Sequence, residues 1–145
     1  MKLHEIKIYQ EFDAPVEQVW EAFNDHANFG RINGLEVERI VDSGDKANIN
    51  GVGSVRLIKI PLMAFEETIR KSEKPKLIEY QVSRGTPLNH HYGTMLFEDL
   101  PGNRSSLNYS ITVGSKIPLM GWIVKRGLQK GISEGLSKYA AKLKK

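Results

Sequence analysis

The stretch IKIYQEFDAPVEQVWEAFNDHANFGRI, residues 6–32, changes its hydrophobic period midway. Up to Phe12, apolar and polar residues alternate, which is typical of a strand with one buried face. Beyond it, apolar residues recur three and four positions apart, as on one side of a helix, and we expect Asp13 to cap this helix with Pro15 in its first turn. Residues 24–30 then break this pattern and predict a short second helical turn. The chain therefore opens with a half-buried strand followed by two short helices.

The next part of the chain contains six segments with strand-like patterns, separated by short turn sequences. The separators contain the Gly, Pro, Asn and Asp that turns require. Alternation is cleanest in the last segment, where one set of side chains is apolar and the other polar. We expect an antiparallel meander with strands at 35–42, 53–60, 65–73, 76–84, 90–99 and 106–113.

After Pro118 the pattern becomes helical, with enough residues for about seven turns of roughly 3.6 residues each. Gly127, Gly131 and Gly135 recur at four-residue spacing on the apolar side of this helix. Each glycine costs about 1 kcal/mol relative to alanine in a helix, which suggests a geometric reason for all three. Either they let the helix pack closely against a neighbour, or they leave space for a ligand over the sheet. The spacing alone does not separate these two interpretations.

The order of elements predicts an α+β fold in which a curved, seven-stranded antiparallel sheet wraps around the long C-terminal helix. The 145 residues show no internal repeat and no linker, so we expect a single domain, residues 1–145. The chain has no cysteine, and its first residues lack the apolar run of a signal peptide. No stretch reaches the roughly 18 apolar residues of a membrane span. We therefore expect a cytoplasmic protein.

Residues 6–32, together with EKPKLIEYQV (73–82) and GTMLFEDLPGNRSSLNYSI (93–111), resemble the SRPBCC or START-like superfamily. Within it, the resemblance is to the bacterial polyketide cyclase/dehydrase and lipid-transport branch. This resemblance implies a helix-grip fold and an apolar cavity between the sheet and residues 119–140, which takes a small hydrophobic ligand. The superfamily shares no invariant catalytic motif and implies no cofactor, so no catalytic residue can be assigned from it.

Strand alternation predicts which side chains face this cavity. If Tyr109 points inward, every second residue of its strand does so too, and the inward residues of the other strands are assigned by the same alternation. The helix contributes its apolar side, and Trp122 offers a further aromatic contact. The predicted ligand-binding residues are Glu67, Tyr80, His91, Met95, Phe97, Tyr109, Met120, Val124 and Leu128.

The adjacent histidines His90 and His91 are separated by the same rule, because neighbouring strand residues point to opposite faces. His91 faces the cavity and His90 faces outward, so they are poorly placed to chelate one metal ion, and we predict no metal site. His91 is the one candidate catalytic residue, as a general acid or base, against the alternative of a structural polar residue. Glu67 either faces inward and pairs with Arg56 or His91, or lies exposed on a bulged strand.

The charge distribution bears on partners. Residues 116–145 hold eight Lys or Arg against one acidic residue, Glu134. We interpret this surplus as the solvated face of a helix and predict no nucleic-acid binding, because no recognised motif accompanies it. Lys116 and Lys125 permit at most a peripheral contact with a membrane. We expect a monomer or homodimer that carries a small hydrophobic molecule, or alternatively a cyclase or dehydratase that uses His91 on a polyketide-like carbonyl compound.

Overall fold

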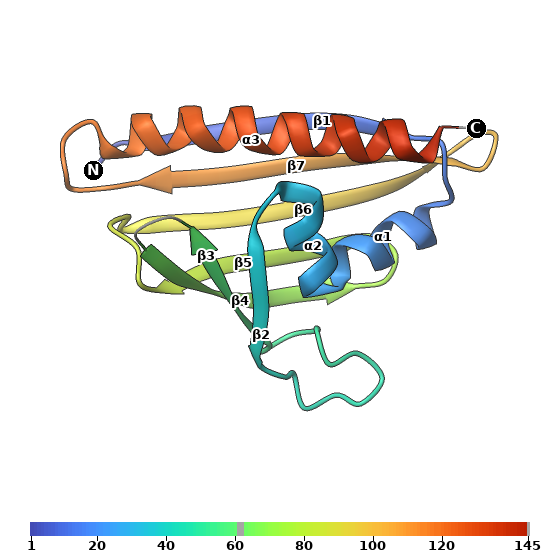
Figure 1. The fold of residues 1–145 in the computed structure, drawn as a ribbon, viewed down its shortest axis with the longest axis horizontal. Coiled ribbons are helices and arrows are strands. Elements are labelled where there is room, and N and C mark those ends of the chain that lie inside the picture. The colour runs from blue at the N-terminus through green and yellow to red at the C-terminus, as the bar shows by residue number, and fades with distance from the viewer. Residues whose placement is uncertain (61–62, 145) are drawn as a thin grey trace.

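Seven antiparallel strands form one sheet, and a long helix lies across one of its faces (Figure 1). The computed structural model describes residues 1–60 and 63–144. In chain order the elements are β1 (Leu3–Phe12), α1 (Val16–Asn24), α2 (His26–Asn33), β2 (Glu36–Val41), β3 (Val55–Ile60), β4 (Met63–Glu73), β5 (Leu77–Arg84), β6 (His90–Leu100), β7 (Arg104–Gly114) and α3 (Met120–Leu143). This arrangement confirms the predicted fold class.

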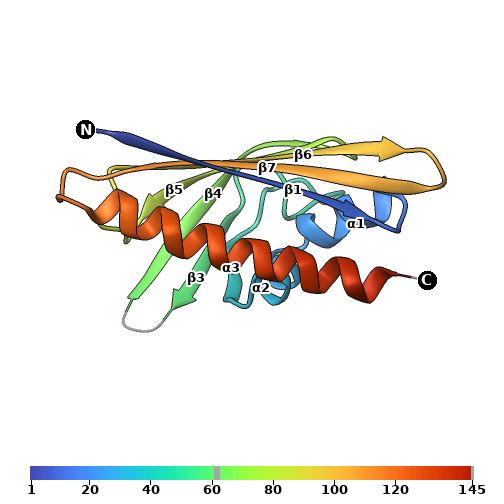
Figure 2. The ribbon, with the colours of Figure 1, turned by 90° about the horizontal axis from the view of Figure 1, so that it is seen from above.

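The order of the strands brings the first and last strands together. It runs β1-β7-β6-β5-β4-β3-β2, so the meander from β2 to β7 ends beside β1. The pairing runs from Leu3 opposite Gly114 to Phe12 opposite Ser105. Figure 2 shows α3 with β1 and β7 on one side of it and β3 and α2 on the other. The sheet therefore curves around α3, as the helix-grip prediction requires.

The two short helices close one end of this layer. The apolar side of α1 is buried, and the Trp20 indole Nε1 donates a hydrogen bond to the Leu77 carbonyl, 3.3 Å away. Pro15, rather than the predicted Asp13, occupies the N-cap position of α1. At the start of α2, the Asp25 carboxylate accepts a hydrogen bond from a backbone N–H in the first turn and caps the helix.

The three regularly spaced glycines of α3 have different surroundings. A Cβ at Gly135 would overlap the Ile32 carbonyl oxygen of α2, so this glycine permits close helix packing. A Cβ at Gly127 or at Gly131 would meet no atom of the described residues within 4 Å. Both interpretations of the spacing are therefore correct, each for a different part of the helix.

Alanine substitutions will separate these roles. Gly127→Ala and Gly131→Ala should each raise the free energy of unfolding by about 1 kcal/mol, because alanine favours the helix and nothing obstructs its methyl group. Gly135→Ala should lower it by about 1 to 3 kcal/mol, because backbone atoms of α2 must shift. Urea denaturation measures all three. Equal effects at the three positions would contradict this division.

Candidate functional site

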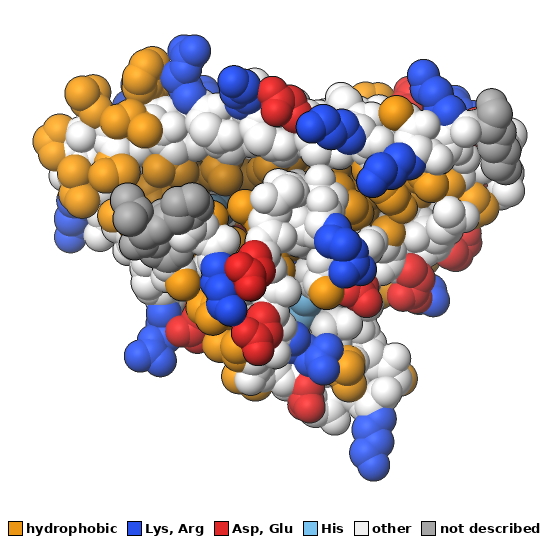
Figure 3. Space-filling view, in the orientation of Figure 1, with side chains coloured by type: hydrophobic (Ala, Val, Ile, Leu, Met, Phe, Trp, Pro, Cys, Tyr) orange, Lys and Arg blue, Asp and Glu red, His pale blue; other side chains and the backbone are white. Residues whose placement is uncertain are grey.

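A cavity of about 130 Å³ lies between the inner face of the sheet and the helices α2 and α3. Five strands, the two helices and the α2–β2 connection contribute to its wall. Figure 3 shows hydrophobic side chains along the lower edge of α3, where the helix meets the rest of the molecule. The lining residues are Phe29, Asn33, Leu35, Ile58, Phe65, Glu67, Tyr80, His91, Tyr109, Gly127, Leu128, Gly131 and Ile132.

A buried ion pair lies at the sheet side of the cavity. Arg56 on β3 stands directly opposite Glu67 on β4, and their side chains are 0% and 3% exposed. The Arg56 Nε and Nη2 atoms each lie 2.8 Å from Glu67 Oε1. The guanidinium also stacks on the Phe29 ring, with its Cζ 3.7 Å from the ring centroid. The strand register does shift between Glu66 and Glu67, yet Glu67 faces inward, so the prediction that it pairs with Arg56 is confirmed.

The ion pair and its surroundings oppose each other in setting the pKa of Glu67. Burial raises the pKa of this carboxyl above its ordinary value, while the Arg56 charge and hydrogen bond lower it. A buried carboxylate without its partner would be expensive, so the guanidinium is what permits the charge in this interior. Glu67 therefore lines the cavity, whereas Arg56 lies directly behind the wall, against the lining residues Phe29, Tyr80 and Glu67.

Three buried polar atoms at or beside the cavity have no hydrogen-bond partner among residues 1–60 and 63–144. They are Arg56 Nη1, His91 Nε2 and Asn33 Oδ1. Buried polar groups are nearly always paired in folded proteins, so three such atoms close to one cavity are unusual. In the cavity wall, His91 can offer an occupant a donor or acceptor and Asn33 an acceptor, while the Arg56 donor lies behind the lining residues.

Two tyrosines connect across the cavity wall. The hydroxyl groups of Tyr80 on β5 and Tyr109 on β7 share a hydrogen bond of 2.5 Å. Tyr80 reaches this position because the residue opposite it on β6 is Gly93, where a Cβ would overlap the tyrosine ring. Burial raises the pKa of both hydroxyl groups, so they stay protonated at neutral pH. They are fixed hydrogen-bond donors or acceptors rather than bases.

The structure separates the two adjacent histidines as predicted. His91 is buried in the cavity wall, and its ring centroid lies 6.1 Å from that of Tyr80. Burial lowers the pKa of His91 to about 4, with further contributions from His90 and Arg56, so the ring is neutral at pH 7. His90 lies on the opposite face, and its Nε2 is 2.7 Å from the Thr112 hydroxyl.

The predicted ligand-binding residues divide into two groups. Glu67, Tyr80, His91, Tyr109 and Leu128 are brought together in the cavity wall. Met95 and Phe97 point to the same face of the sheet but are buried in the core, and Phe97 packs against Phe23 of α1. Met120 and Val124 pack against the core outside the cavity, and Trp122 is largely exposed.

Several lining residues were not predicted from the sequence. Phe29 and Asn33 come from α2, and Leu35 from the connection to β2. The rotation of so short a helix about its axis has no clear sequence signal. Ile132 belongs to the recognised apolar side of α3, so the helical spacing was the signal that could have identified it.

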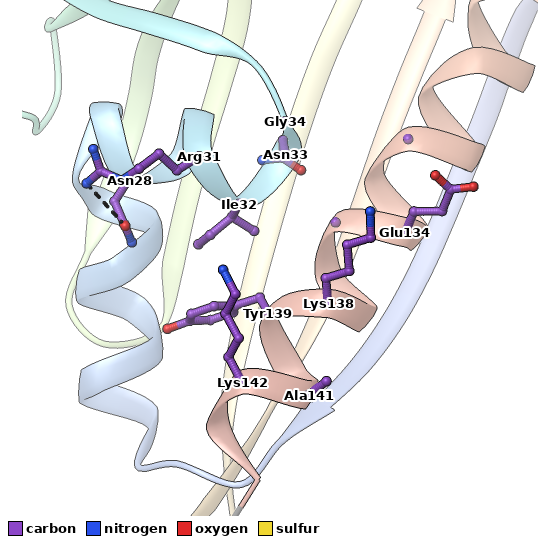
Figure 4. A pocket seen from close by; sticks show the side chains of 12 residues that line it. Asn28, Arg31, Ile32, Asn33, Gly34, Glu134, Lys138, Tyr139, Ala141 and Lys142 are labelled. Atoms are coloured by element: carbon purple, nitrogen blue, oxygen red, sulfur yellow. Dashed lines mark hydrogen bonds between the residues drawn. The ribbon is translucent and has the colours of Figure 1, made fainter.

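An open groove between α2 and α3 borders the cavity, since Asn33 and Gly131 line both. The groove has a volume of about 740 Å³. Figure 4 shows Ile32 of α2 and Tyr139 of α3 facing each other across it, with basic side chains at its rim. The groove and the cavity therefore adjoin each other on the side of α3 that carries Gly131.

Comparisons with solved structures agree with the helix-grip architecture. A START superfamily protein from Mycobacterium smegmatis superposes with a TM-score of 0.78 at 13% identity, over 97% of this chain and 99% of that one. Ara h 8.0201 gives 0.69 at 16% identity, over 97% and 99%. Norcoclaurine synthase from Thalictrum flavum, solved with dopamine and hydroxybenzaldehyde, gives 0.66 at 14% identity, over 99% and 90%. At these identities the similarity establishes the fold alone.

Sequence comparison identifies the family directly. A search of curated proteins finds no match to this sequence. The family model described as polyketide cyclase/dehydrase and lipid transport matches residues 4–145, which is nearly the whole chain. The chain therefore belongs to the polyketide cyclase/dehydrase and lipid-transport family.

Proposed function

We propose that this protein binds one small, largely hydrophobic molecule with a polar or anionic end in the cavity beneath α3. The observation that carries the proposal is the unpaired, buried His91 Nε2 in the wall of a largely apolar cavity, with the unpaired Arg56 Nη1 directly behind the lining residues Phe29 and Tyr80. Ligand sites combine apolar walls with a few fixed polar groups in this way. Membership of a family that includes lipid-transport proteins supports the same conclusion.

The size and charge of the site suggest a class of ligand. A cavity of about 130 Å³ is close to the roughly 150 Å³ that accommodates benzene, so a single ring fits without rearrangement. The Arg56 guanidinium favours a carboxylate, a phenolate or an enolate oxygen. A longer molecule would extend past Gly131 into the groove between α2 and α3. The complex of norcoclaurine synthase with hydroxybenzaldehyde, a single ring with polar substituents, is consistent with this class.

Native mass spectrometry of gently purified protein tests the proposal. The wild-type protein should carry an additional small mass that organic extraction releases and identifies. Leu128→Trp should abolish it by filling the cavity, whereas Gln129→Trp, which adds the same side chain to the exposed neighbouring position, should retain it. If Leu128→Trp does not fold, Gly131→Leu is the second variant, because a side chain at Gly131 meets no nearby atom of the described residues and should reduce the cavity volume. Equal occupancy in the variant and its control would contradict the proposal.

One observation supports a second candidate function, a cyclase or dehydratase activity on a carbonyl compound. The neutral His91 ring has a free Nε2 in the cavity wall, and whichever of the Tyr80 and Tyr109 hydroxyl groups accepts their mutual hydrogen bond can donate its own proton to a developing enolate oxygen. With a pKa of about 4, however, His91 is a weak base at neutral pH, which favours binding over proton transfer. In the same experiment, conversion of an added carbonyl compound by the wild-type protein, but not by Leu128→Trp, would indicate an enzyme.

A further inference from the structure

A second surface, at the end of the molecule where α3 begins, exposes a cluster of large apolar side chains. Leu3 opens β1, Ile117 and Leu119 lie between β7 and α3, and Trp122 and Ile123 lie in the first turn of α3. Figure 3 shows hydrophobic side chains gathered at this end of the molecule. The segments are neighbours, because Leu3 pairs with Gly114 and a Cβ at Gly121 would touch His4. We call Leu3, Ile117, Leu119, Trp122 and Ile123 the apolar tip.

The backbone conformation of Leu119 holds its side chain in an exposed position. It occupies the N-cap position of α3 with φ 66° and ψ −10°, a left-handed conformation that is unfavourable for leucine. Its side chain is 73% exposed, so the strained conformation presents a large apolar group to the outside without gaining core contacts. Glycine or asparagine would form the same turn with less strain. Strain of this kind, unrelieved by packing, points to a function for the exposed side chain.

The charged residues of the apolar tip's loop and helix segment are all positive, and on β1 Lys2 adjoins Leu3 while the nearest acid, Glu5, is paired with Lys7. Residues 114–133 contain Lys116, Lys125, Arg126 and Lys130 and no acidic residue. Arg126 also lies over the Trp122 ring, with its Cζ 5.2 Å from the ring centroid. A self-associated dimer would bring these cations against their own copies. An anionic lipid bilayer, in contrast, offers phosphates to the cations and an apolar layer to the tip.

We propose that the apolar tip docks on the surface of an anionic lipid bilayer. The contact is peripheral: in the parts of the chain that the structure describes, no helix has both the length and the hydropathy that crossing a membrane requires. Ile123 lies one helical turn before Gly127, which lines the cavity, so docking brings the cavity close to the lipid. The proposal concerns a surface separate from the ligand cavity and stands independently of what the cavity binds.

Trp122 provides a direct readout of docking. Trp122 is 49% exposed whereas Trp20, the other tryptophan, is 2% exposed, so a change in tryptophan emission on adding lipid reports mainly on the tip. Vesicles containing phosphatidylserine should shift the emission to shorter wavelength and sediment the protein at low salt. Vesicles of phosphatidylcholine alone should do neither, and high salt should reverse the binding.

Variants test each component of the surface. Leu119→Asn should lower the partition onto anionic vesicles about tenfold while leaving the protein folded, because asparagine tolerates the left-handed conformation. Lys116→Glu combined with Lys125→Glu should lower it by more than about tenfold. Lys142→Glu combined with Lys144→Glu, at the opposite end of α3, changes the net charge equally and is the matched control, which should bind as the wild type does. Absence of binding to anionic vesicles at low salt, equal binding to neutral vesicles, or unchanged binding in the tip variants would overturn the proposal.

Discussion

Glu67→Leu should lower the free energy of unfolding by about 3 to 5 kcal/mol. The substitution leaves the fully buried Arg56 guanidinium without a counter-charge, and breaking one partner of a buried ion pair costs about this much. Combining it with Arg56→Met removes both charges and should restore most of the loss, because apolar side chains of similar volume replace the pair. Urea unfolding of the wild type, both single variants and the double variant measures this coupling.

An exposed ion pair offers the matched comparison. Lys7 and Glu5 on β1 lie 3.0 Å apart, with side chains 76% and 52% exposed, so removing one partner should change stability by less than about 1 kcal/mol. A comparably small loss for Glu67→Leu would show that water reaches Arg56. Such a result would contradict the closed, weakly hydrated interior on which the cavity assignment depends.

Acidification should destabilise the protein between about pH 6.5 and pH 4, because two histidines are buried in the neutral form. Burial lowers the pKa of His26 to about 3, with added repulsion from Arg56 and Arg39, and lowers that of His91 to about 4. In the unfolded chain both titrate near 6.5, so over this range the unfolded state binds more protons than the native state. The free energy of unfolding is therefore highest above pH 6.5 and falls as the pH decreases.

The expected loss is about 2 to 3 kcal/mol for each histidine at pH 4.5. Urea unfolding at a series of pH values measures the slope. His91→Gln should remove about half of it, and His26→Gln the other half, although the latter replaces a ring that hydrogen-bonds Ser54. A stability that does not change between pH 7 and pH 4.5 would mean that both rings are protonated in the native state. The cavity wall would then carry a further positive charge.

The period of two in strands explains how much of the cavity could be predicted from the sequence. Alternation placed Tyr80, His91 and Tyr109 on the inner face, because a strand side chain has only two directions, but it left Glu67 open because a bulge could have turned it outward. Alternation does not show, however, whether an inward side chain lies beneath α3 in the cavity or beneath α1 in the core. Phe97 has the same parity as His91 but meets Phe23 of α1 and becomes core.

The helices contributed what the sequence did not show. A short helix such as α2 can place any of several sides against the sheet, so Phe29 and Asn33 could not be assigned to the cavity in advance. The spacing of the α3 glycines predicted either close packing of α3 against a neighbouring element or open space between α3 and the sheet. Only the three-dimensional path of α2 determines that Gly135 lies against Ile32 while Gly127 and Gly131 do not.

Methyl NMR titration with benzoate and with toluene tests the central claim most directly. Both probes have the size of the cavity, and only benzoate has an anionic group for Arg56. The account predicts saturable shifts of the Ile58, Leu128 and Ile132 methyl groups with both probes, and tighter binding of benzoate. That preference should disappear in the double variant Arg56→Met/Glu67→Leu. Absence of saturable shifts at these methyl groups, or shifts restricted to Ile32 in the outer groove, would contradict the assignment of this cavity as the binding site.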